Sequence, residues 1–265
     1  MVLSVLIKYP FQTKESNKVF FKKQELINLN WPQQGGWFDT DGYITFNYNK
    51  KNKHWQKRAG LKLSDRQPVE LFSKIFKTSL TYHESTTWTP KPYRKEYLCK
   101  QYIAEIRGDK AIWFTKNVYP YLIKEEKKDF AAELLGYRPK SKDFADWTPD
   151  EVVHYLATAL EGDGQYYVHQ GKRNKTMEIS LHSSHAQYLS DVQNLAQTKL
   201  GLILKMQERS TYETQKGIRT KYVLRGYCSL QNPENLGFFQ SLAKEGVMTL
   251  DRKKQRVQEF LNFIL

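Results

Sequence analysis

The stretch that decides the fold is Trp31–Gly42, WPQQGGWFDTDG, which has the early proline typical of a short helix. Its interior would contain Gly35 and Gly36, although each interior glycine costs a helix about 1 kcal/mol relative to alanine. Asp39 and Asp41 would lie in the last turn, where the helix dipole is negative and disfavours carboxylates. A chain that accepts these penalties in one helix must have a reason other than the stability of that helix.

A second stretch, TPDEVVHYLATALEGDG at Thr148–Gly164, repeats this arrangement. Thr148 and Glu151 predict a capping box at the start of the helix. Both stretches end in Asp-Gly, and we expect Gly42 and Gly164 to adopt the left-handed conformation that closes a helix. The chain is therefore predicted to contain the same kind of helix twice.

The segments that follow the two helices also correspond. Each helix precedes a strand with a polar turn, a second strand, an amphipathic helix, a hairpin-like pair of strands and a basic helix. The first half should place these elements at 43–53, 58–64, 65–80, 97–116 and 124–136. The second half should place them at 165–175, 177–183, 185–202, 202–230 and 251–265. One αββαββα unit thus occurs twice, which predicts an α+β fold with two pseudo-symmetric halves.

The repeat divides the chain into four parts. We expect an N-terminal arm at 1–22, the first half at 23–136, a polar linker at 137–147 and the second half at 148–265. Because both halves lie in one chain, the pseudo-twofold axis is internal. A monomer with no obligate protein partner is therefore expected.

Composition limits the classes of function. The 265 residues include 42 Lys and Arg against 28 Asp and Glu, and the net charge of +14 predicts a polyanionic partner, with nucleic acid the leading one. Cys99 and Cys228 are too few for a disulfide framework and are expected to be reduced thiols. No apolar run approaches the ~18 residues of a membrane span, and the apolar start is too short for a signal peptide. We therefore expect an intracellular protein with no membrane partner.

The two helices ending in GGWFDTDG and LATALEGDG, each opening an αββαββα half, resemble the single-chain, two-motif LAGLIDADG homing endonucleases. The resemblance covers nearly the whole chain after residue 25. It implies that the motif helices pack side by side at the centre, and that the antiparallel sheets form a DNA-binding saddle. It also accounts for the glycines, because closely packed helices need small residues: Gly35 and Gly36 would face Ala157, Thr158 and Ala159.

The resemblance further implies a metal site at the ends of the motifs. The final acids, Asp41 and Asp163, would be catalytic and would bind divalent metal beside the scissile phosphates, together with Gly42 and Gly164. Mg²⁺ suits a site with few carboxylates and with phosphate oxygens, and two or more ions can activate water and stabilise the leaving oxygen. We expect Mn²⁺ to substitute, and Ca²⁺ to support DNA binding but little cleavage.

Basic residues near the site are also implied, to polarise the phosphate or to order water. By position, Lys127 and Lys253 are the expected catalytic lysines, with Lys124 and Arg252 as near alternatives. Solvated basic helix ends are an equal alternative interpretation of these lysines.

Four other polar residues carry weaker expectations. In the family, acids placed like Asp39 and Glu161 hold helix ends in place more often than they bind metal. Asp65 and Ser183, at the ends of the second strands, would touch the water network of the site.

Strand alternation predicts which side chains face DNA. Ile44, Phe46 and Tyr48 share the face that we assign to the core. The opposite faces offer amides, hydroxyls and cations, which are the groups that read base edges in the major groove. These predicted DNA-binding residues are Tyr43, Thr45, Asn47, Asn49, Lys51, Arg58, Lys62, Ser64, Gln165, Tyr167, His169, Arg173, Glu178, Ser180 and His182. Later strands would extend the saddle over the phosphates with Lys100, Arg107, Lys116, Arg219, Lys221 and Arg225. The alternative is that these are ordinary solvated strand faces.

The leading hypothesis is an intron-encoded, site-specific homing endonuclease that makes a double-strand break in a long, non-palindromic DNA target by metal-dependent hydrolysis. Two alternatives share the fold: a maturase that binds intron RNA to assist splicing, and a non-cutting DNA-binding regulator. Acids at both motif ends favour cleavage, because neither alternative requires them. The lysine-rich composition suggests an AT-rich organelle genome, mitochondrial or chloroplast, with cytoplasm or nucleus as the other locations.

Overall fold

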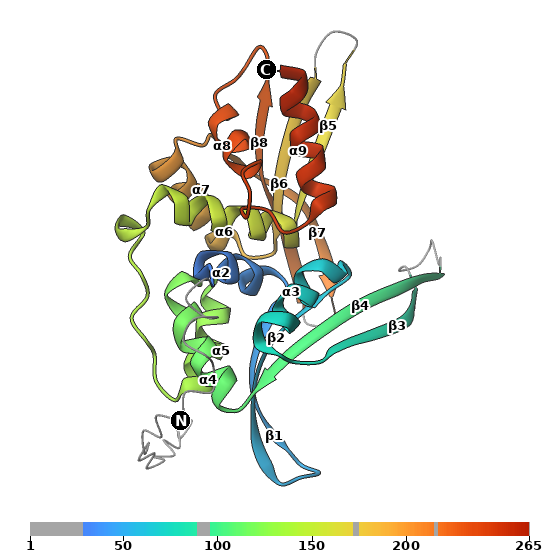
Figure 1. Cartoon of the computed structure of the whole chain (residues 1–265), viewed down its shortest axis with the longest axis vertical. Coiled ribbons are helices and arrows are strands. Elements are labelled where there is room, and N and C mark those ends of the chain that lie inside the picture. Colours follow the sequence, from blue (N-terminus) through green and yellow to red (C-terminus); the bar gives the residue numbers. More distant parts are fainter. Residues whose placement is uncertain (1–28, 89–95, 172–174, 215–216, 265) are drawn as a thin grey trace.

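The computed structural model describes residues 29–88, 96–171, 175–214 and 217–264 (Figure 1). The first half consists of α2 (Trp31–Thr40), β1 (Gly42–Asn49), β2 (His54–Leu63), α3 (Arg66–Phe76), β3 (Leu80–Trp88), β4 (Glu96–Arg107), α4 (Asp109–Val118), η1 (Tyr119–Tyr121) and α5 (Glu125–Leu135). After the 3-10 turn η2 (Phe144–Asp146), the second half consists of α6 (Pro149–Gly162), β5 (Gly164–Gln170), β6 (Lys175–Ser183), α7 (Ala186–Leu200), β7 (Lys205–Thr214), β8 (Gly217–Ser229), α8 (Leu236–Leu242) and α9 (Asp251–Ile264).

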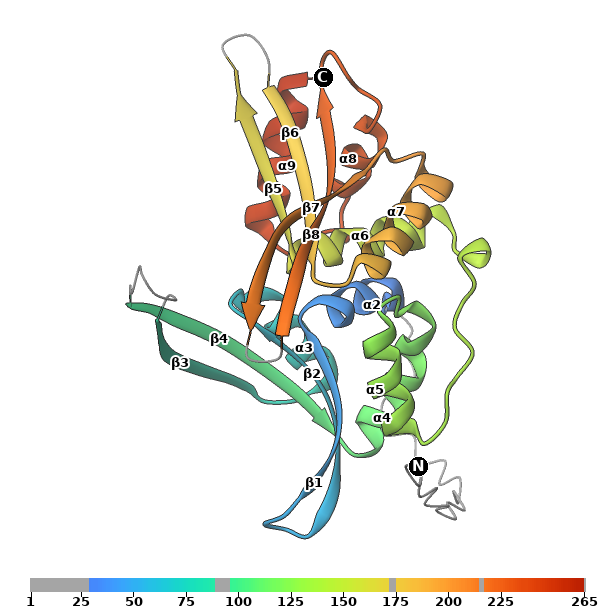
Figure 2. The same ribbon diagram turned by 180° about the vertical axis from the view of Figure 1, so that it is seen from behind.

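Each half is built around one four-stranded antiparallel sheet. The strand orders are β1-β2-β4-β3 and β5-β6-β8-β7, so the second sheet repeats the topology of the first. The register repeats as well, because Gly42 pairs with Leu61 and Gly164 with Leu181. In Figure 2 the strands of the second sheet lie in front of α8 and α9, which cover its other face. The predicted α+β fold with two pseudo-symmetric halves is confirmed.

The motif helices α2 and α6 lie side by side at the centre of the molecule (Figure 1). Gly36 makes this packing possible, because a Cβ at this position would collide with the Thr158 hydroxyl and the Tyr155 carbonyl of α6. The Thr158 Oγ1 also donates a hydrogen bond of 2.9 Å across the interface to the carbonyl oxygen of Gln33. The predicted contact of Gly36 with Thr158 is confirmed.

Gly35 does not take part in this helix contact, contrary to the prediction. A Cβ at Gly35 would meet the backbone and the Cβ of Tyr121, which lies in the turn η1. This glycine therefore makes room for the segment that leads into α5, and not for the second motif helix.

The helix ends also differ from the prediction. The capping box of Thr148 and Glu151 is present, but neither Gly42 nor Gly164 has a positive φ, and each opens a strand. A Cβ at Gly42 would stand 2.6 Å from a backbone atom of the preceding helix, and one at Gly164 would stand 2.5 Å away. The glycines allow each chain to turn sharply from helix into strand while it stays against the helix backbone.

Among the described residues, each half has one more helix than expected, α4 or α8. The hairpin predicted at 97–116 was wrong, because β3 precedes β4 and the chain turns into α4 at Gly108, which has φ 59°. Phe114 and Val118, four residues apart, are buried on one face of α4. Lys116 therefore lies on a helix and not on a strand of the saddle.

The β1–β2 hairpin extends beyond the helices that cover the rest of its sheet (Figure 2). Ile44 is buried as predicted, but Tyr48 and Trp55 near the tip are 47% and 52% exposed. The partly buried ring of Phe46 stacks on Trp55 with centroids 4.6 Å apart. The assignment of Tyr48 to the core was wrong, because strand alternation defines a face but not whether anything covers that face.

Residues 137–147 connect α5 to α6 and end on a buried side chain. Trp147 is 2% exposed, and its ring packs edge-on against Tyr155 with centroids 5.5 Å apart. Lys142 forms an ion pair with Glu151, with Nζ 2.6 Å from a carboxylate oxygen. The predicted arm at 1–22 lies outside the described residues. Within the described ranges, no helix combines the length and the apolar character needed to cross a membrane.

Candidate metal centre and nucleic-acid interface

Asp41 and Asp163 end the two motif helices, each as the residue between its helix and the following strand. The helices are in contact at this end, because Gly162 of α6 lies against the Asp41 carboxylate and a Cβ there would collide with Oδ2. The motif pairing therefore brings the two acids to the region where the two sheets begin.

Burial disfavours the ionised form of both acids. Burial, and to a smaller extent the negative charge of Asp163, raises the pKa of Asp41 to about 7. Burial also raises the pKa of Asp163. Lysines oppose these shifts, with Lys253 acting most strongly on Asp41 and Lys124 on Asp163. Carboxylates in this state gain from any additional cation that binds next to them.

The donor set fits a hard cation that keeps other oxygen ligands. Asp41 Oδ2 is buried and has no hydrogen-bond partner among the described residues, so it is free to bind a cation. No three acidic, histidine or cysteine side chains come together in the part of the chain that the structure describes. A divalent ion would therefore depend on the two carboxylates together with phosphate oxygens and water, which is the coordination that Mg²⁺ prefers.

The two glycines predicted to share the metal site are placed differently. The carbonyl oxygen of Gly42 accepts a hydrogen bond of 2.5 Å from Lys127 Nζ, and that of Gly164 accepts one of 3.0 Å from Lys253 Nζ. An ammonium group next to each carbonyl repels a second cation. This arrangement argues against Gly42 and Gly164 as metal ligands.

The lysines predicted from position do approach the motif ends. Lys253 is 5% exposed, and its Nζ also donates to the carbonyls of Leu160 and Glu161 at 2.9 and 2.5 Å. In the first half the corresponding contacts are divided, because Lys124 Nζ donates to the Asp39 carbonyl at 2.8 Å while Lys127 reaches Gly42. Burial lowers the pKa of Lys253 to about 8 and also lowers that of Lys127.

Two pockets flank the ends of the motif helices, and each combines residues of both halves. The first, here called the Asp41 pocket, has a volume of ≈ 490 Å³, and its lining includes Asp41, Asp65, Gln165, Arg252 and Lys253. The second, the Asp163 pocket, has a volume of ≈ 450 Å³, and its lining includes Lys124, Asp163, His182, Ser183, His185 and Lys221. Each acid therefore shares its pocket with a lysine of the opposite half.

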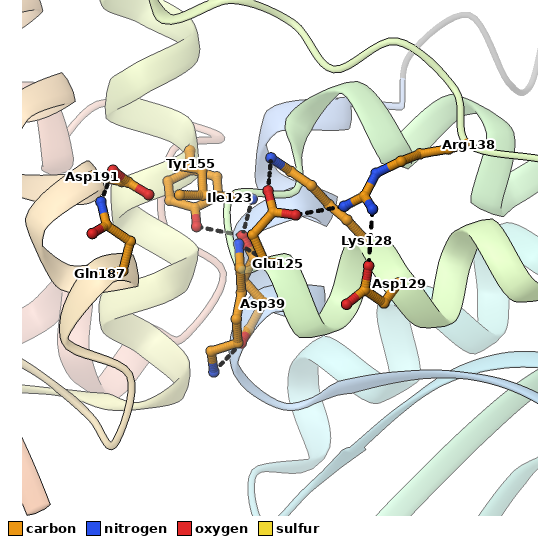
Figure 3. A network of polar contacts seen from close by, with 10 residues as sticks. Asp39, Ile123, Glu125, Lys128, Asp129, Arg138, Tyr155, Gln187 and Asp191 are labelled. Atoms are coloured by element: carbon orange, nitrogen blue, oxygen red, sulfur yellow. Dashed lines mark hydrogen bonds and ion pairs between the residues drawn. The ribbon is translucent and has the colours of Figure 1, made fainter. Parts of the chain in front are cut away.

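The two earlier acids of the motifs hold the segments that lead into the last helix of each half. Figure 3 shows Asp39 between Ile123 and Tyr155. Asp39 accepts hydrogen bonds from the backbone N–H groups of Ile123 and Lys124 at 2.7 and 3.2 Å. Glu161 likewise accepts from the N–H groups of Thr249 and Leu250, both at 2.7 Å. Both acids are fully enclosed by protein, and these contacts fit the expected role in holding helix ends.

Two polar pairs connect the halves at corresponding positions, with the acid on opposite sides. Asp65 caps α3 and accepts two hydrogen bonds, of 3.0 and 2.6 Å, from Arg252, the second residue of α9. His185 caps α7, and its Nε2 lies 3.2 Å from a carboxylate oxygen of Glu126, the second residue of α5. The acid is thus on the cap in one pair and on the terminal helix in the other. Ser183 lines the Asp163 pocket, and its Oγ accepts a hydrogen bond from the N–H of His185.

The bare face of the first sheet carries most of its predicted DNA-binding residues. Alternation places Tyr43, Thr45 and Asn47 there, opposite Gly60, Arg58 and Gln56 in the register of β2. Two of the predicted residues are engaged within the protein: the Tyr43 hydroxyl donates to Glu105 at 2.9 Å, and Arg58 lies 3.7 Å from the same carboxylate.

The end of the first hairpin is used differently from the prediction. Asn49 Oδ1 accepts hydrogen bonds from the N–H groups of Lys51 and Asn52, so its side chain closes the turn. Lys51 lies in that turn, beyond the end of β1. Lys62 and Ser64 are exposed as expected.

On the predicted DNA-facing side of the second sheet, several polar side chains contact one another. Gln165, Tyr167 and His169 are exposed on β5, as predicted. On β6, Glu178 lies 2.8 Å from His169 Nε2 and 3.4 Å from Arg225 Nε, which neutralises part of the face. Ser180 is only 4% exposed. Arg173 lies outside the described residues. The two faces therefore differ residue by residue.

Sequence reasoning missed three residues of this region: Gln33, Tyr155 and His185. Gln33 and Tyr155 each lie eight residues before the final acid of their motif, so the repeat itself could have marked them as a corresponding pair. His185 gave no such signal, because its partner Glu126 belongs to the other half.

Comparison with known proteins places the chain among LAGLIDADG folds. Residues 150–241 match the family model of the LAGLIDADG-like domain. The structure of the LAGLIDADG homing endonuclease I-GzeII in complex with its DNA target has 12% identical residues and a TM-score of 0.56, with 89% of each chain covered. That of the LAGLIDADG meganuclease I-AabMI bound to uncleaved DNA has 13% identity and a TM-score of 0.51, with 89% of this chain and 90% of that chain covered. No curated protein matches the chain in sequence.

Proposed function

We propose that this protein is a divalent-metal-dependent endodeoxyribonuclease. The match of residues 150–241 to the LAGLIDADG-like domain and the fold shared with two homing endonucleases support this proposal. The protein would make a double-strand break in a long, non-palindromic DNA site. The observation that carries this proposal is the pair of acids at the paired helix ends: Asp41 and Asp163 are both buried enough to resist ionisation, and Asp41 Oδ2 has no hydrogen-bond partner in the described residues.

The side chains around the acids suit phosphodiester hydrolysis. Asp41 and Asp163 would hold Mg²⁺, and the bound ion would supply an activated water and stabilise the leaving oxygen. Lys253 and Lys124 add positive charge to the Asp41 and Asp163 pockets, where a phosphate would carry negative charge. Their hydrogen bonds to backbone carbonyls fix these ammonium groups before any substrate arrives.

The bare faces of the two sheets would bind the duplex. The net charge of +14 favours a polyanion, and the strands present amide, hydroxyl and imidazole groups at the spacing of alternate residues. The two faces differ in their residues and in the contacts that their side chains make with one another, which supports a target without twofold symmetry. Both halves are in one chain, so the proposal includes a monomer. It also includes an intron-borne gene and an organellar location, for which the flanking DNA of the gene is the most direct evidence.

Selection from a randomised DNA pool tests the function without knowledge of the target. Full-length protein is incubated with the pool in Mg²⁺, cut molecules are recovered, and a plasmid carrying the selected site is then cleaved in Mg²⁺, Mn²⁺, Ca²⁺ or EDTA. We expect linear plasmid with Mg²⁺ and Mn²⁺, little with Ca²⁺ and none with EDTA. Asp41→Asn and Asp163→Asn should each abolish the double-strand break while DNA binding persists.

Three other outcomes would contradict the proposal or part of it. Selective DNA binding without cutting under any of these metals would identify a DNA-binding regulator. Preferential retention of structured RNA over duplex DNA, again without cutting, would favour the splicing role. Cleavage by either Asn variant at the wild-type rate would show that the substituted aspartate does not hold the catalytic metal.

A further inference from the structure

Gln33 and Tyr155 occupy equivalent places in the two motif helices and reach across the interface between them. Each precedes the final acid of its own helix by eight residues, Gln33 before Asp41 and Tyr155 before Asp163. Both are buried, with exposed fractions of 9% and 0%. The hydrogen bonds of these two side chains go to groups other than Asp41 and Asp163, so a role in the site must pass through those groups.

Gln33, on the first motif helix, holds a segment of the second half. Its Nε2 donates hydrogen bonds to the carbonyl oxygens of Gly246 and Val247, at 2.6 and 2.9 Å. Because both partners are acceptors, the amide orientation is fixed. The same segment continues into the two N–H groups that bind Glu161, and then into α9, which carries Lys253.

Tyr155, on the second motif helix, holds a segment of the first half. Figure 3 shows its hydroxyl directed at Asp39, to which it donates a hydrogen bond of 2.6 Å. The same carboxylate binds the N–H groups of Ile123 and Lys124, immediately before α5. Lys124 in turn lines the Asp163 pocket.

The contacts of each motif helix lead to one of the two pockets. The first motif helix supplies Asp41 to one pocket and, through Gln33, fixes the segment that places Lys253 in that same pocket. The second motif helix supplies Asp163 to the other pocket and, through Tyr155 and Asp39, fixes the segment that places Lys124 there. Each motif helix thus supplies the acid of one pocket and also contacts the segment that leads to the lysine of that pocket. The lysine's own half holds the same segment through Glu161 or Asp39.

We propose that Gln33 and Tyr155 are positioning residues, and that each acts on one pocket only: Gln33 on the Asp41 pocket and Tyr155 on the Asp163 pocket. This inference rests on the proposed endonuclease function for its catalytic consequence. If each pocket serves one DNA strand, loss of one contact slows cleavage of one strand and leaves the other largely unaffected. The two variants therefore have opposite strand preferences.

The test uses substitutions that remove the hydrogen bond and keep the volume. Gln33→Met and Tyr155→Phe are made in the full-length chain, with Gln34→Met as the matched control. Gln34 is the adjacent buried glutamine, and its Oε1 has no hydrogen-bond partner in the described residues. Cleavage is followed under single-turnover conditions on a target with a different label on each strand.

We expect Gln33→Met to slow one strand by on the order of tenfold, since small misplacements of a catalytic group reduce rates strongly. Tyr155→Phe should slow the other strand, and Gln34→Met should leave the ratio of the two strand rates at the wild-type value. Equal slowing of both strands by either variant, or the same strand preference in both, would overturn the inference.

A second measurement does not depend on cutting. Hydrogen exchange is followed in the free protein at the amides of Thr249 and Leu250, and at those of Ile123 and Lys124. Gln33→Met should speed exchange at the first pair alone and Tyr155→Phe at the second pair alone. Uniform changes would contradict the positioning role even if the enzyme cuts. If the wild type does not cut DNA, the proposed function fails, and this exchange pattern alone decides whether the crosswise contacts hold.

Discussion

Gly162 of the second motif helix lies directly against the carboxylate of Asp41 at the end of the first. The contact brings one acid under the backbone of the opposite helix, and it leaves no room for a side chain at position 162. It explains in part why Asp41 is so poorly solvated and why burial is the leading cause of its raised pKa. The close pairing of the two motif helices therefore contributes to the raised pKa of Asp41.

Asp41→Asn is expected to stabilise the metal-free protein, and increasingly so as pH rises. Burial raises the Asp41 pKa from 3.8 to about 7 on folding, so the folded state binds its proton more tightly and stability falls as pH rises through this window. Asparagine has no proton to lose. In EDTA, the difference in Tm between variant and wild type should be larger at pH 8 than at pH 5.

Added Mg²⁺ provides the control for this prediction. A cation that binds the folded wild type raises its Tm by mass action, whereas the variant should gain less. A pH-independent difference in Tm between Asp41→Asn and wild type would contradict the electrostatic explanation.

The same substitution two residues earlier should have the opposite effect. Asp39 accepts hydrogen bonds from two N–H groups and from Tyr155, and an asparagine would turn an NH₂ group towards one of these donors. Leaving a buried donor unsatisfied costs about 1–3 kcal/mol. Urea unfolding of Asp39→Asn should show a loss of this size, and wild-type stability would be the contrary result.

Gly36→Ala should destabilise the protein although alanine is the better helix former. The gain in helix propensity is about 1 kcal/mol, but a Cβ here collides with the Tyr155 carbonyl, which belongs to a helix backbone and cannot move aside. Overpacking of this kind typically costs about 1–3 kcal/mol. Gly237→Ala in α8 is the control, because a Cβ there meets nothing within 4 Å and should be neutral or stabilising. Chemical denaturation of both variants compares the two effects.

The pair of Arg252 and Asp65 should show a favourable coupling between the halves. Asp65→Arg and Arg252→Asp each place like charges in contact, whereas the double variant restores an attractive pair with its direction reversed. A double-mutant cycle in urea should give a coupling of about 0.2–1 kcal/mol, because the pair is partly exposed. The coupling should shrink in 0.5 M salt, and additivity of the two single variants at low salt would refute it.

Asn47 and Tyr48 are adjacent residues on opposite faces of β1, so they form a matched pair for the DNA-reading prediction. If Asn47 reads base edges, Asn47→Ala should relax the preference at one or two base pairs of one half-site. Tyr48 lies on the opposite face, beyond the helices that cover the rest of that face, so Tyr48→Ala should leave the preference intact. Site selection with both variants measures this, and uniform weakening across all sequences would show that Asn47 does not read bases.

Local patterns were enough to predict much of the fold. The capping box of Thr148 and Glu151 and the repeated order of elements follow from residue types at fixed spacing, and the strand faces follow from alternation. The helix α4 was missed because its segment contains β-branched and aromatic residues near strand-like neighbours. Its buried positions at 111, 114 and 118 nevertheless have helical spacing.

Other features depend on contacts that no local pattern contains. The exposure of Tyr48 follows from where the covering helices stop, and the placement of Gly35 follows from where η1 passes. For the candidate site, the acids and lysines could be found by position in the repeat. The division of each pocket between the halves could not, because it arises only when the two motif helices pack together.

The two polar pairs, in which the acid changes sides, have a consequence for the history of the chain. A molecule made from two first halves would set Asp65 against Glu126, and one made from two second halves would set Arg252 against His185. The first combination puts two carboxylates in contact, which is repulsive. The second puts two basic side chains in contact and leaves each without its acceptor. If the halves arose from one duplicated ancestor, these pairs mark a stage at which the copies had stopped being interchangeable, so that recombination between them would give a less stable product.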